Sequence, residues 1–444
     1  MPARRAVIIS LFLLLYVLSG MGQEPLKHST SEHQGMKMDE SHMDAPENFI
    51  DQIEDHTTSG TSAEPASTPS SMFMLPKGNW MFMFHGQAFL NLQQQSGPRG
   101  ADKLFSTDWI MPMAQRRFGS STLTLRTMLS FDPGTITGRF YPELFQQGET
   151  AFGRPIVDGQ HPHDFLMEIA ALLDTRIGEK TLLSLYVAPV GDPAMGPLAY
   201  AHRPSAAEDP LSPLGHHLED STHIVDDVVT VGITHRAVRL EASGFHGREP
   251  DEHRWDFDSG KIDSWSGRLT ITPRANWSGQ FSFAHLSSPE DLHPSEDLQR
   301  MTASVSYNRP LTAGNWASLV LWGRNRSLTN GMVSNGYLAE STLRFKGGNY
   351  IWGRIENVDR TSELLLGRNV LPPGFEERVI GRVQASSIGY DHDFNLVPHL
   401  ETALGAQATF YGVPDTLKPT YGSHPAGVVV FLRVRPADGM HHHH

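Results

Sequence analysis

From residue 80 to residue 435 the chain alternates apolar and polar side chains in short segments. Within 337–346, for example, Ala339 and Leu343 alternate with Glu340 and Arg344. Every second side chain of a strand lies on the same face, so this pattern predicts strands with one apolar and one polar face. We expect sixteen strands, at residues 80–93, 108–117, 119–132, 163–177, 180–190, 222–235, 237–247, 261–273, 276–287, 298–309, 315–326, 337–346, 349–359, 378–393, 398–411 and 425–435.

The connections between these segments are alternately short and long. Gly347 and Gly348 form a tight turn, whereas the connections at 133–162 and 191–221 reach about thirty residues. Bacterial outer-membrane barrels combine short periplasmic turns, long outer loops and an even number of strands. The sequence therefore predicts an all-β fold, a transmembrane antiparallel β-barrel of about 16 strands (roughly 14 to 18) in the outer membrane of a Gram-negative cell, with loops 133–162, 191–221 and 248–260 facing the exterior.

The first 75 residues have a different composition. Arg4 and Arg5 precede an apolar run at 6–18 and the small residues of 20–22, which is the pattern of a secretory signal peptide. Residues 23–75 are rich in Ser, Thr, Pro and acidic residues and poor in the apolar side chains that a core requires. We predict a signal peptide at 1–22, a disordered periplasmic leader at 23–75, the barrel at 76–436 and a polar histidine tail at 437–444.

The leader contains three histidines and three methionines close together, and the whole chain lacks cysteine. Any soft metal must therefore be bound by thioether and imidazole groups, which suit copper and especially Cu(I). The candidate copper ligands in the leader are His28, His33, Met36, Met38, His42 and Met43. The alternative is an acidic spacer whose methionines have no role.

Methionines also recur at every second position of the first two expected strands. Phe82 and Phe84 have the opposite parity, so phenylalanines that face lipid would leave the methionines facing the lumen. The candidate ligands on this inner wall are Met81, Met83, His85, Met111 and Met113. Weak, exchangeable ligands in a row suit the passage of a soft ion. In the alternative, these methionines face lipid or pack against the N-terminal segment.

A third group of candidate ligands lies where the two longest connections end. Its members are His161, His163, Asp164, His216, His217 and His223. Side chains at i and i+2 of an extended segment point the same way, and a carboxylate can orient an imidazole ring or add an oxygen ligand. Three roles are open: fixing the loops, binding a metal ion, or catalysis in a hydrolase that acts on lipid or glycan. For catalysis, we find no nucleophile in a recognisable sequence context.

The charge of the chain excludes one class of partner. Residues 23–70 hold ten acidic residues and only two lysines, out of a net charge of −13 for the whole chain. The barrel region is left with little net charge and with no basic stripe suited to nucleic acid. The expected partners are outer-membrane lipid, a metal ion and periplasmic copper-handling proteins.

The leader, together with Met81-Phe82-Met83-Phe84-His85 on the first strand, resembles the copper resistance protein B family. That resemblance implies a role in handling excess copper at the outer membrane. The segments 160–164, 216–223 and 247–255 look more like a group of uncharacterised bacterial outer-membrane proteins, which implies no activity. Our leading hypothesis is a non-enzymatic barrel for copper sequestration, resistance or export, with copper as its only cofactor. The alternatives are a general porin or solute channel, and an outer-membrane hydrolase.

Overall fold

The computed structural model describes residues 48–55, 58–69, 72–367, 369–394 and 396–437. The predicted signal peptide and the histidine tail from residue 438 lie outside these residues. The same is true of the six candidate ligands of the leader, His28, His33, Met36, Met38, His42 and Met43.

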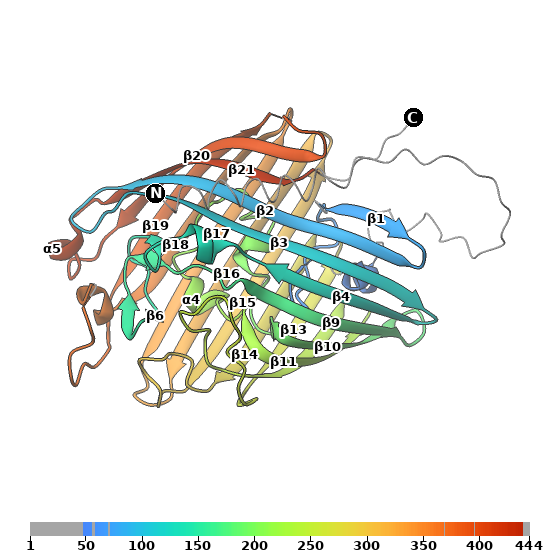
Figure 1. Cartoon of the computed structure of the whole chain (residues 1–444), viewed down its shortest axis with the longest axis horizontal. Coiled ribbons are helices and arrows are strands. Elements are labelled where there is room, and N and C mark those ends of the chain that lie inside the picture. The colour runs from blue at the N-terminus through green and yellow to red at the C-terminus, as the bar shows by residue number, and fades with distance from the viewer. Residues whose placement is uncertain (1–47, 56–57, 70–71, 368, 395, 438–444) are drawn as a thin grey trace.

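Sixteen antiparallel strands form a closed barrel (Figure 1), because the last strand pairs with the first. The strands are β2 (Trp80–Gln95), β3 (Lys103–Phe118), β4 (Ser121–Leu129), β9 (Leu166–Arg176), β10 (Thr181–Gly191), β11 (Val225–His235), β12 (Val238–Phe245), β13 (Ser264–Arg274), β14 (Trp277–Leu286), β15 (Leu298–Leu311), β16 (Gly314–Ser327), β17 (Val333–Phe345), β18 (Asn349–Thr361), β19 (Val379–Asp393), β20 (Leu400–Gly412) and β21 (Ala426–Pro436). The fold class and the strand number that the alternation predicted are confirmed.

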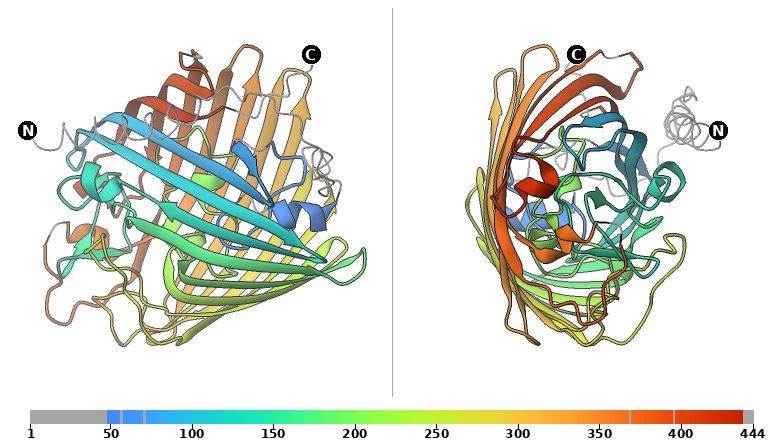
Figure 2. Two further views of the ribbon diagram at one scale, coloured as in Figure 1. Left: turned by 45° about the vertical axis from the view of Figure 1, so that its right-hand side comes forward. Right: turned by 90° about the vertical axis from the view of Figure 1, so that its left-hand side faces the viewer.

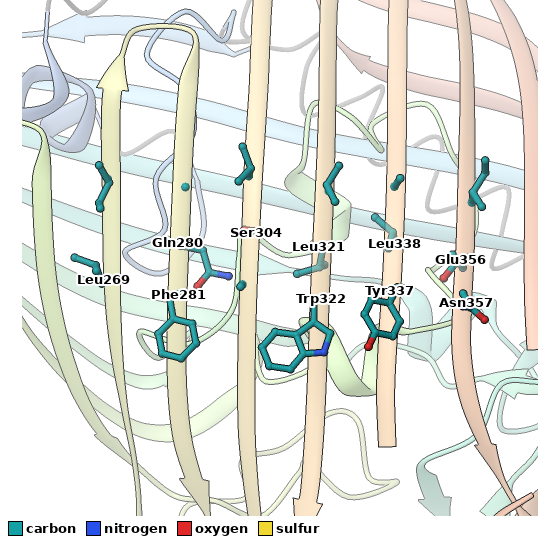
Figure 3. A pocket seen from close by; sticks show the side chains of 17 residues that line it. Leu269, Gln280, Phe281, Ser304, Leu321, Trp322, Tyr337, Leu338, Glu356 and Asn357 are labelled. Carbon is teal, nitrogen blue, oxygen red and sulfur yellow. The ribbon is translucent and has the colours of Figure 1, made fainter. Parts of the chain in front are cut away.

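The outer face of the barrel is apolar and the inner face is polar. Val320 and Ile355 are 62% and 64% exposed, whereas Glu340 and Arg354 of the neighbouring strands are buried. Apolar side chains of β13 to β18 line a groove of about 660 Å³, with Phe281 among them (Figure 3). Exposed tryptophans near the strand ends resemble the aromatic girdles of membrane barrels. The outer face therefore suits contact with membrane lipid.

The two rims differ as the sequence predicts. At one rim the strands are joined by short turns, such as 119–120, 236–237 and 312–313. At the other rim the connections are longer, and those at 130–165 and 192–224 exceed all the rest. The connection 130–165 contains α3 (Asp132–Thr135), β5 (Tyr141–Pro142), β6 (Glu149–Ala151), β7 (Arg154–Ile156) and β8 (Gly159–Gln160), and the connection 192–224 contains η2 (Tyr200–His202) and α4 (His216–Glu219). Among the described residues, no helix is both long enough and apolar enough to cross a membrane.

The connection 192–224 folds into the barrel, and the prediction that it faces the exterior is wrong. Nε of Arg203 lies 2.8 Å from Oε1 of Glu340, and Oδ2 of Asp209 lies 3.1 Å from Nη1 of Arg354. Ser205 is buried and donates to the same Glu340. Charges of the connection thus complement those of the inner wall, which holds the segment inside the ring of strands (Figure 2).

Residues 48–55 and 58–69 occupy the short-turn end of the interior, although we expected them to belong to a disordered leader. Helix α2 (Phe49–Asp55) packs on Leu182, and Nη2 of Arg126 donates to the carbonyl oxygen of Gly60 at 2.6 Å. The short strand β1 (Phe73–Lys77) then pairs with the start of β2. The wall supplies the apolar contacts and hydrogen bonds that this segment lacks on its own. The remaining described helices, η3 (Ser362–Leu365) and α5 (Lys418–Tyr421), lie in outer connections.

Candidate metal centre

Two connections bring histidines from distant parts of the sequence into one buried cluster. The rings of His161 and His217 have centroids 6.2 Å apart, and His216 lies 5.1 Å from His217. His223 lies 5.3 Å from His216 and 5.7 Å from His163. We call these five residues, together with Glu149, the histidine centre. Their common location at the ends of the long connections was an expectation from the sequence, but their metal-binding role remains a prediction.

Close packing of α4 on the barrel wall positions His216 and His217. A Cβ atom at Gly323 of β16 would overlap the carbonyl oxygen of Leu218, and one at Gly336 would lie 2.8 Å from Oε1 of Glu219. Gly323 and Gly336 face each other in the β16–β17 register. This pair of glycines therefore lets the helix approach the wall more closely than any larger residue would allow.

Three histidines of the centre are oriented by oxygen acceptors. Nδ1 of His163 lies 2.9 Å from Oδ2 of Asp132, and Nδ1 of His216 lies 2.6 Å from Oδ1 of Asp220. Nδ1 of His223 lies 2.8 Å from the carbonyl oxygen of Asp220. Since these oxygens accept, we assign the ring proton to Nδ1 in all three residues. The lone pair of each Nε2 is then available. Histidines that bind metal ions usually have this arrangement, in which the other ring nitrogen donates its proton to an oxygen atom.

The tightest group consists of Glu149, His161 and His217, whose ligand atoms all lie within 4.8 Å of one another. Nδ1 of His161 donates to the carbonyl oxygen of Pro162 at 2.8 Å, which leaves a lone pair on Nε2. That Nε2 faces Oε1 of Glu149 at 2.8 Å, and Nδ1 of His217 lies 3.3 Å from the same oxygen. Two acceptors at this distance need a proton between them, and a metal ion could take the place of that proton.

Burial keeps the imidazoles of the centre neutral, which is the state in which imidazole can bind a metal ion. Desolvation, followed by the charge of Arg254, holds the pKa of His161 well below its usual value. Desolvation also lowers the pKa of His217, and that of His223 to about 3, so the three imidazoles are neutral at pH 7. Desolvation raises the pKa of Glu149 to about 7, against the opposing charge of Arg254. Glu149 can therefore share its proton with His161 when no metal ion is bound.

Several nitrogen atoms of the centre make no hydrogen bond within the described part of the chain. Among the described residues, Nε2 of His163, His217 and His223 is buried without a hydrogen-bond partner. An unsatisfied buried polar atom is costly, and an ion is one of the few groups that explain it. The donor set of imidazoles and one carboxylate fits a transition-metal ion.

Asp164 contacts an arginine. Its carboxylate lies 3.4 Å from Nη1 of Arg254, whose charge compensates the buried carboxylate. The role expected from the sequence, to orient a histidine or to add an oxygen ligand, stays a prediction. The catalytic role that the sequence left open for these histidines also stays a prediction. Asp132 and Glu149, which the sequence did not single out, contact His163 and His161 respectively.

The candidate ligands of the first two strands lie on the inner wall, as their parity predicts. Met83 pairs with Met113 in the β2–β3 register, and His85 pairs with Met111. Met83, Met111 and Met113 are buried in one apolar cluster, against which Met81 packs. Their position toward the lumen agrees with the expectation, whereas their metal-binding role stays a prediction.

Comparison with known proteins identifies the fold but no family. No protein-family profile matches the chain, and no curated protein matches it either. The resemblance to the copper resistance protein B family therefore has no support from these comparisons. Among solved structures, the chain is similar to an anion-selective porin from Comamonas acidovorans, with 11% identity, a TM-score of 0.50, and coverage of 80% of this chain and 99% of the porin. The Salmonella typhi OmpF complex with daunomycin matches with 8% identity and a TM-score of 0.49, over 82% and 100% of the two chains.

The fold is thus that of an outer-membrane porin. A closed barrel leaves no unpaired strand edge, and its apolar outer band matches the hydrocarbon layer of a bilayer. Barrels with one trimmed and one elaborated rim are characteristic of the outer membrane of Gram-negative bacteria, and this chain is located there.

Proposed function

We propose that this protein is an outer-membrane barrel that binds a divalent transition-metal ion at the histidine centre. One observation carries the proposal. Four neighbouring imidazoles, those of His161, His163, His216 and His223, each direct Nδ1 to an oxygen atom and leave Nε2 available. Such an arrangement costs free energy in a protein that uses these residues only for packing.

The donor types narrow the choice of ion. Imidazole with one carboxylate suits Zn(II), Cu(II) and Ni(II), whereas Mg(II) and Ca(II) prefer shells of oxygen ligands. Cu(II) is thus among the suitable ions, and the copper hypothesis drawn from the sequence remains compatible with this site. Capture of the ion, without an enzymatic reaction, is the function that we propose.

A general porin or solute channel is the second candidate, and the likeness to an anion-selective porin favours it. The connection 192–224 argues for capture instead, because it occupies the interior and is tied to the wall by Arg203 and Asp209. For a solute to pass freely, this connection would have to leave the barrel. Conductance and metal binding therefore discriminate between the two functions.

Zn(II) titration of the full-length protein in detergent tests the proposal. The parent for all variants carries alanine at the histidines outside the described residues, namely His28, His33, His42, His56 and His441 to His444. We expect this parent to bind Zn(II), and the variants His161→Ala and His217→Ala to bind it at least about tenfold more weakly. The matched control is His246→Ala, an outer-rim histidine that contacts the carbonyl oxygen of Lys261.

Two results would refute the proposal. The first is a parent whose Zn(II) affinity is the same with and without His161 and His217. The second is a high, steady conductance of the parent in planar bilayers that Zn(II) leaves unchanged, which would support the solute channel.

A further inference from the structure

A second group of side chains that could bind a metal ion lies inside the barrel, mostly on the inner wall of β2, β3, β4 and β9. Its members are buried methionines that pack around Trp109, with Met81 at the edge. We call this group the methionine cluster, and its buried methionines are Met72, Met83, Met111, Met113, Met128 and Met167. Seven of the 17 methionines of the chain thus gather at one place.

Strand register explains how the sequence produces this cluster. The pairs Met83 with Met113 and His85 with Met111 are neighbours on one face of β2 and β3. Facing side chains of adjacent antiparallel strands have Cβ atoms only about 5 Å apart. Met113 in turn pairs with Arg126 of β4, two residues before Met128. The thioethers therefore share the polar, inner face of the barrel.

His202 reaches this cluster from the connection 192–224. Its Nε2 lies 3.1 Å from Sδ of Met128, and its ring lies 4.1 Å from that of Trp109 and 6.4 Å from that of His85. Within the described part of the chain, Nδ1 of His202 is buried without a hydrogen-bond partner. An imidazole is thus buried beside a thioether, which is a poor hydrogen-bond partner.

The charge balance of the cluster differs from that of the histidine centre. Glu168 faces Met128 across the β4–β9 pair, but Arg126 contacts this carboxylate at 2.7 Å and Tyr186 donates to it at 2.7 Å. The carboxylate is therefore already compensated, and the donors left for an ion are neutral thioethers and imidazoles. Neutral soft donors suit a monovalent soft ion better than a divalent one.

We infer that Met111, Met113, Met128 and His202 form a site for a monovalent soft cation, Cu(I) or its analogue Ag(I), separate from the histidine centre. The inference uses other residues than the proposed function and stands independently of it. Its competitor is simple packing, because methionine is flexible and fills irregular gaps in apolar cores. Leucine has nearly the same volume and no sulfur, so it separates the two explanations.

Ag(I) is the probe, since it has no accessible redox chemistry under these conditions. The full-length parent carries the alanine substitutions described above and also Met36→Leu, Met38→Leu and Met43→Leu, which remove the thioethers among the candidate ligands of the leader. The test variant adds Met111→Leu, Met113→Leu and Met128→Leu. The control adds Met195→Leu, a buried methionine of a different apolar cluster.

We expect the parent to bind Ag(I) with sulfur neighbours in its X-ray absorption spectrum. The triple leucine variant should lose those neighbours and bind Ag(I) at least about tenfold more weakly. The Met195→Leu control should behave like the parent. Zn(II) binding should be unchanged in the triple variant, and Ag(I) binding should survive His217→Ala. Zn(II) binding therefore tests the histidine centre alone, and Ag(I) binding tests the methionine cluster alone, so one proposal can fail without the other.

Folding of each variant is checked by its heat-modifiable mobility in gels. If the triple variant does not fold, the single variant Met128→Leu takes its place, and the same loss of affinity is expected. Ag(I) affinity that is equal in the leucine variant and the parent would overturn the inference. Ag(I) bound by nitrogen or oxygen alone would overturn it as well.

Discussion

Nδ1 of His163 lies 2.9 Å from Oδ2 of Asp132, although 31 residues separate the two in the sequence. Asp132 begins helix α3 shortly after β4 ends at Leu129, and His163 lies shortly before β9 begins at Leu166. The contact therefore ties the two ends of the longer outer connection together. It also fixes the tautomer of His163, so that Nε2 points away from the carboxylate with its lone pair free.

This contact leads to a first prediction. Asp132→Asn preserves the shape of the side chain but removes its charge, which weakens the orientation and the basicity of His163. We expect Zn(II) affinity to fall by about 10- to 100-fold without loss of a ligand. Isothermal titration checks the change. Asp164→Asn is the matched control, because that carboxylate pairs with Arg254 instead of a histidine, and equal losses in both variants would contradict the assignment.

A second prediction concerns the connection inside the barrel. Arg203 contacts both Asp220 and Glu340, and all three side chains are buried. Arg203→Gln removes the arginine at Asp220 and leaves Glu340 with Arg354 alone. Breaking a buried ion pair costs roughly 3–5 kcal/mol. We expect the connection 192–224 to become sensitive to protease in the folded barrel and the bilayer conductance to rise.

The exposed pair of Arg248 and Asp291 provides the control for this experiment, since exposed ion pairs contribute little. Arg248→Gln should change neither protease sensitivity nor conductance. If Arg203→Gln behaved in the same way, the wall pairs would not be what retains the connection.

The third prediction tests the close approach of α4 to the wall. Gly323→Ala places a methyl group against the carbonyl oxygen of Leu218, so α4 must move and carry His216 and His217 with it. We expect weaker Zn(II) binding with the barrel still folded. Gly267→Ala is the control, because its Cβ would meet the carbonyl oxygen of Glu241 at an ordinary 3.6 Å. Unchanged affinity in Gly323→Ala would show that the position of α4 does not matter.

A fourth prediction follows from Glu143, a buried residue of the connection 130–165. Burial raises its pKa from 4.5 to about 8, against a hydrogen bond from Ser212. The folded state then holds this proton more tightly than the unfolded state, so Glu143 makes the protein less stable as pH rises from 4.5 to about 8. Glu143→Gln removes that loss.

Thermal unfolding followed by circular dichroism checks the effect of Glu143→Gln. Relative to the parent, the variant should gain stability at pH 9, by an amount of the order of a few kcal/mol, and should gain little at pH 5. The same difference at both pH values would show that Glu143 does not titrate in the folded protein.

Local patterns explain why the barrel was predictable. The parity of Met83 and Phe84 follows from the two-residue period of a strand, which any short segment reveals. The lengths of tight turns, such as the one at 347–348, can also be recognised from a short segment of sequence. Burial of Met83 on the inner face and pairing of β2 with β3 then follow from the closed sheet.

Contacts between distant residues could not be predicted in this way. Arg203 and Glu340 lie 137 residues apart in the sequence, and neither residue carries a sequence signal for the other. The same holds for Asp132 with His163. Asp164 was chosen because it is adjacent in sequence, yet a more distant Arg254 binds it.

An anomalous difference map of crystals soaked in Zn(II) tests the central claim most directly. We predict a peak about 2.0–2.2 Å from Nε2 of His161, from a carboxylate oxygen of Glu149 and from a nitrogen atom of His217 or its neighbours. The peak should vanish in crystals of the His161→Ala variant. Zn(II) found only at the terminal run His441 to His444, with no peak among the buried histidines, would contradict the proposed metal-binding function.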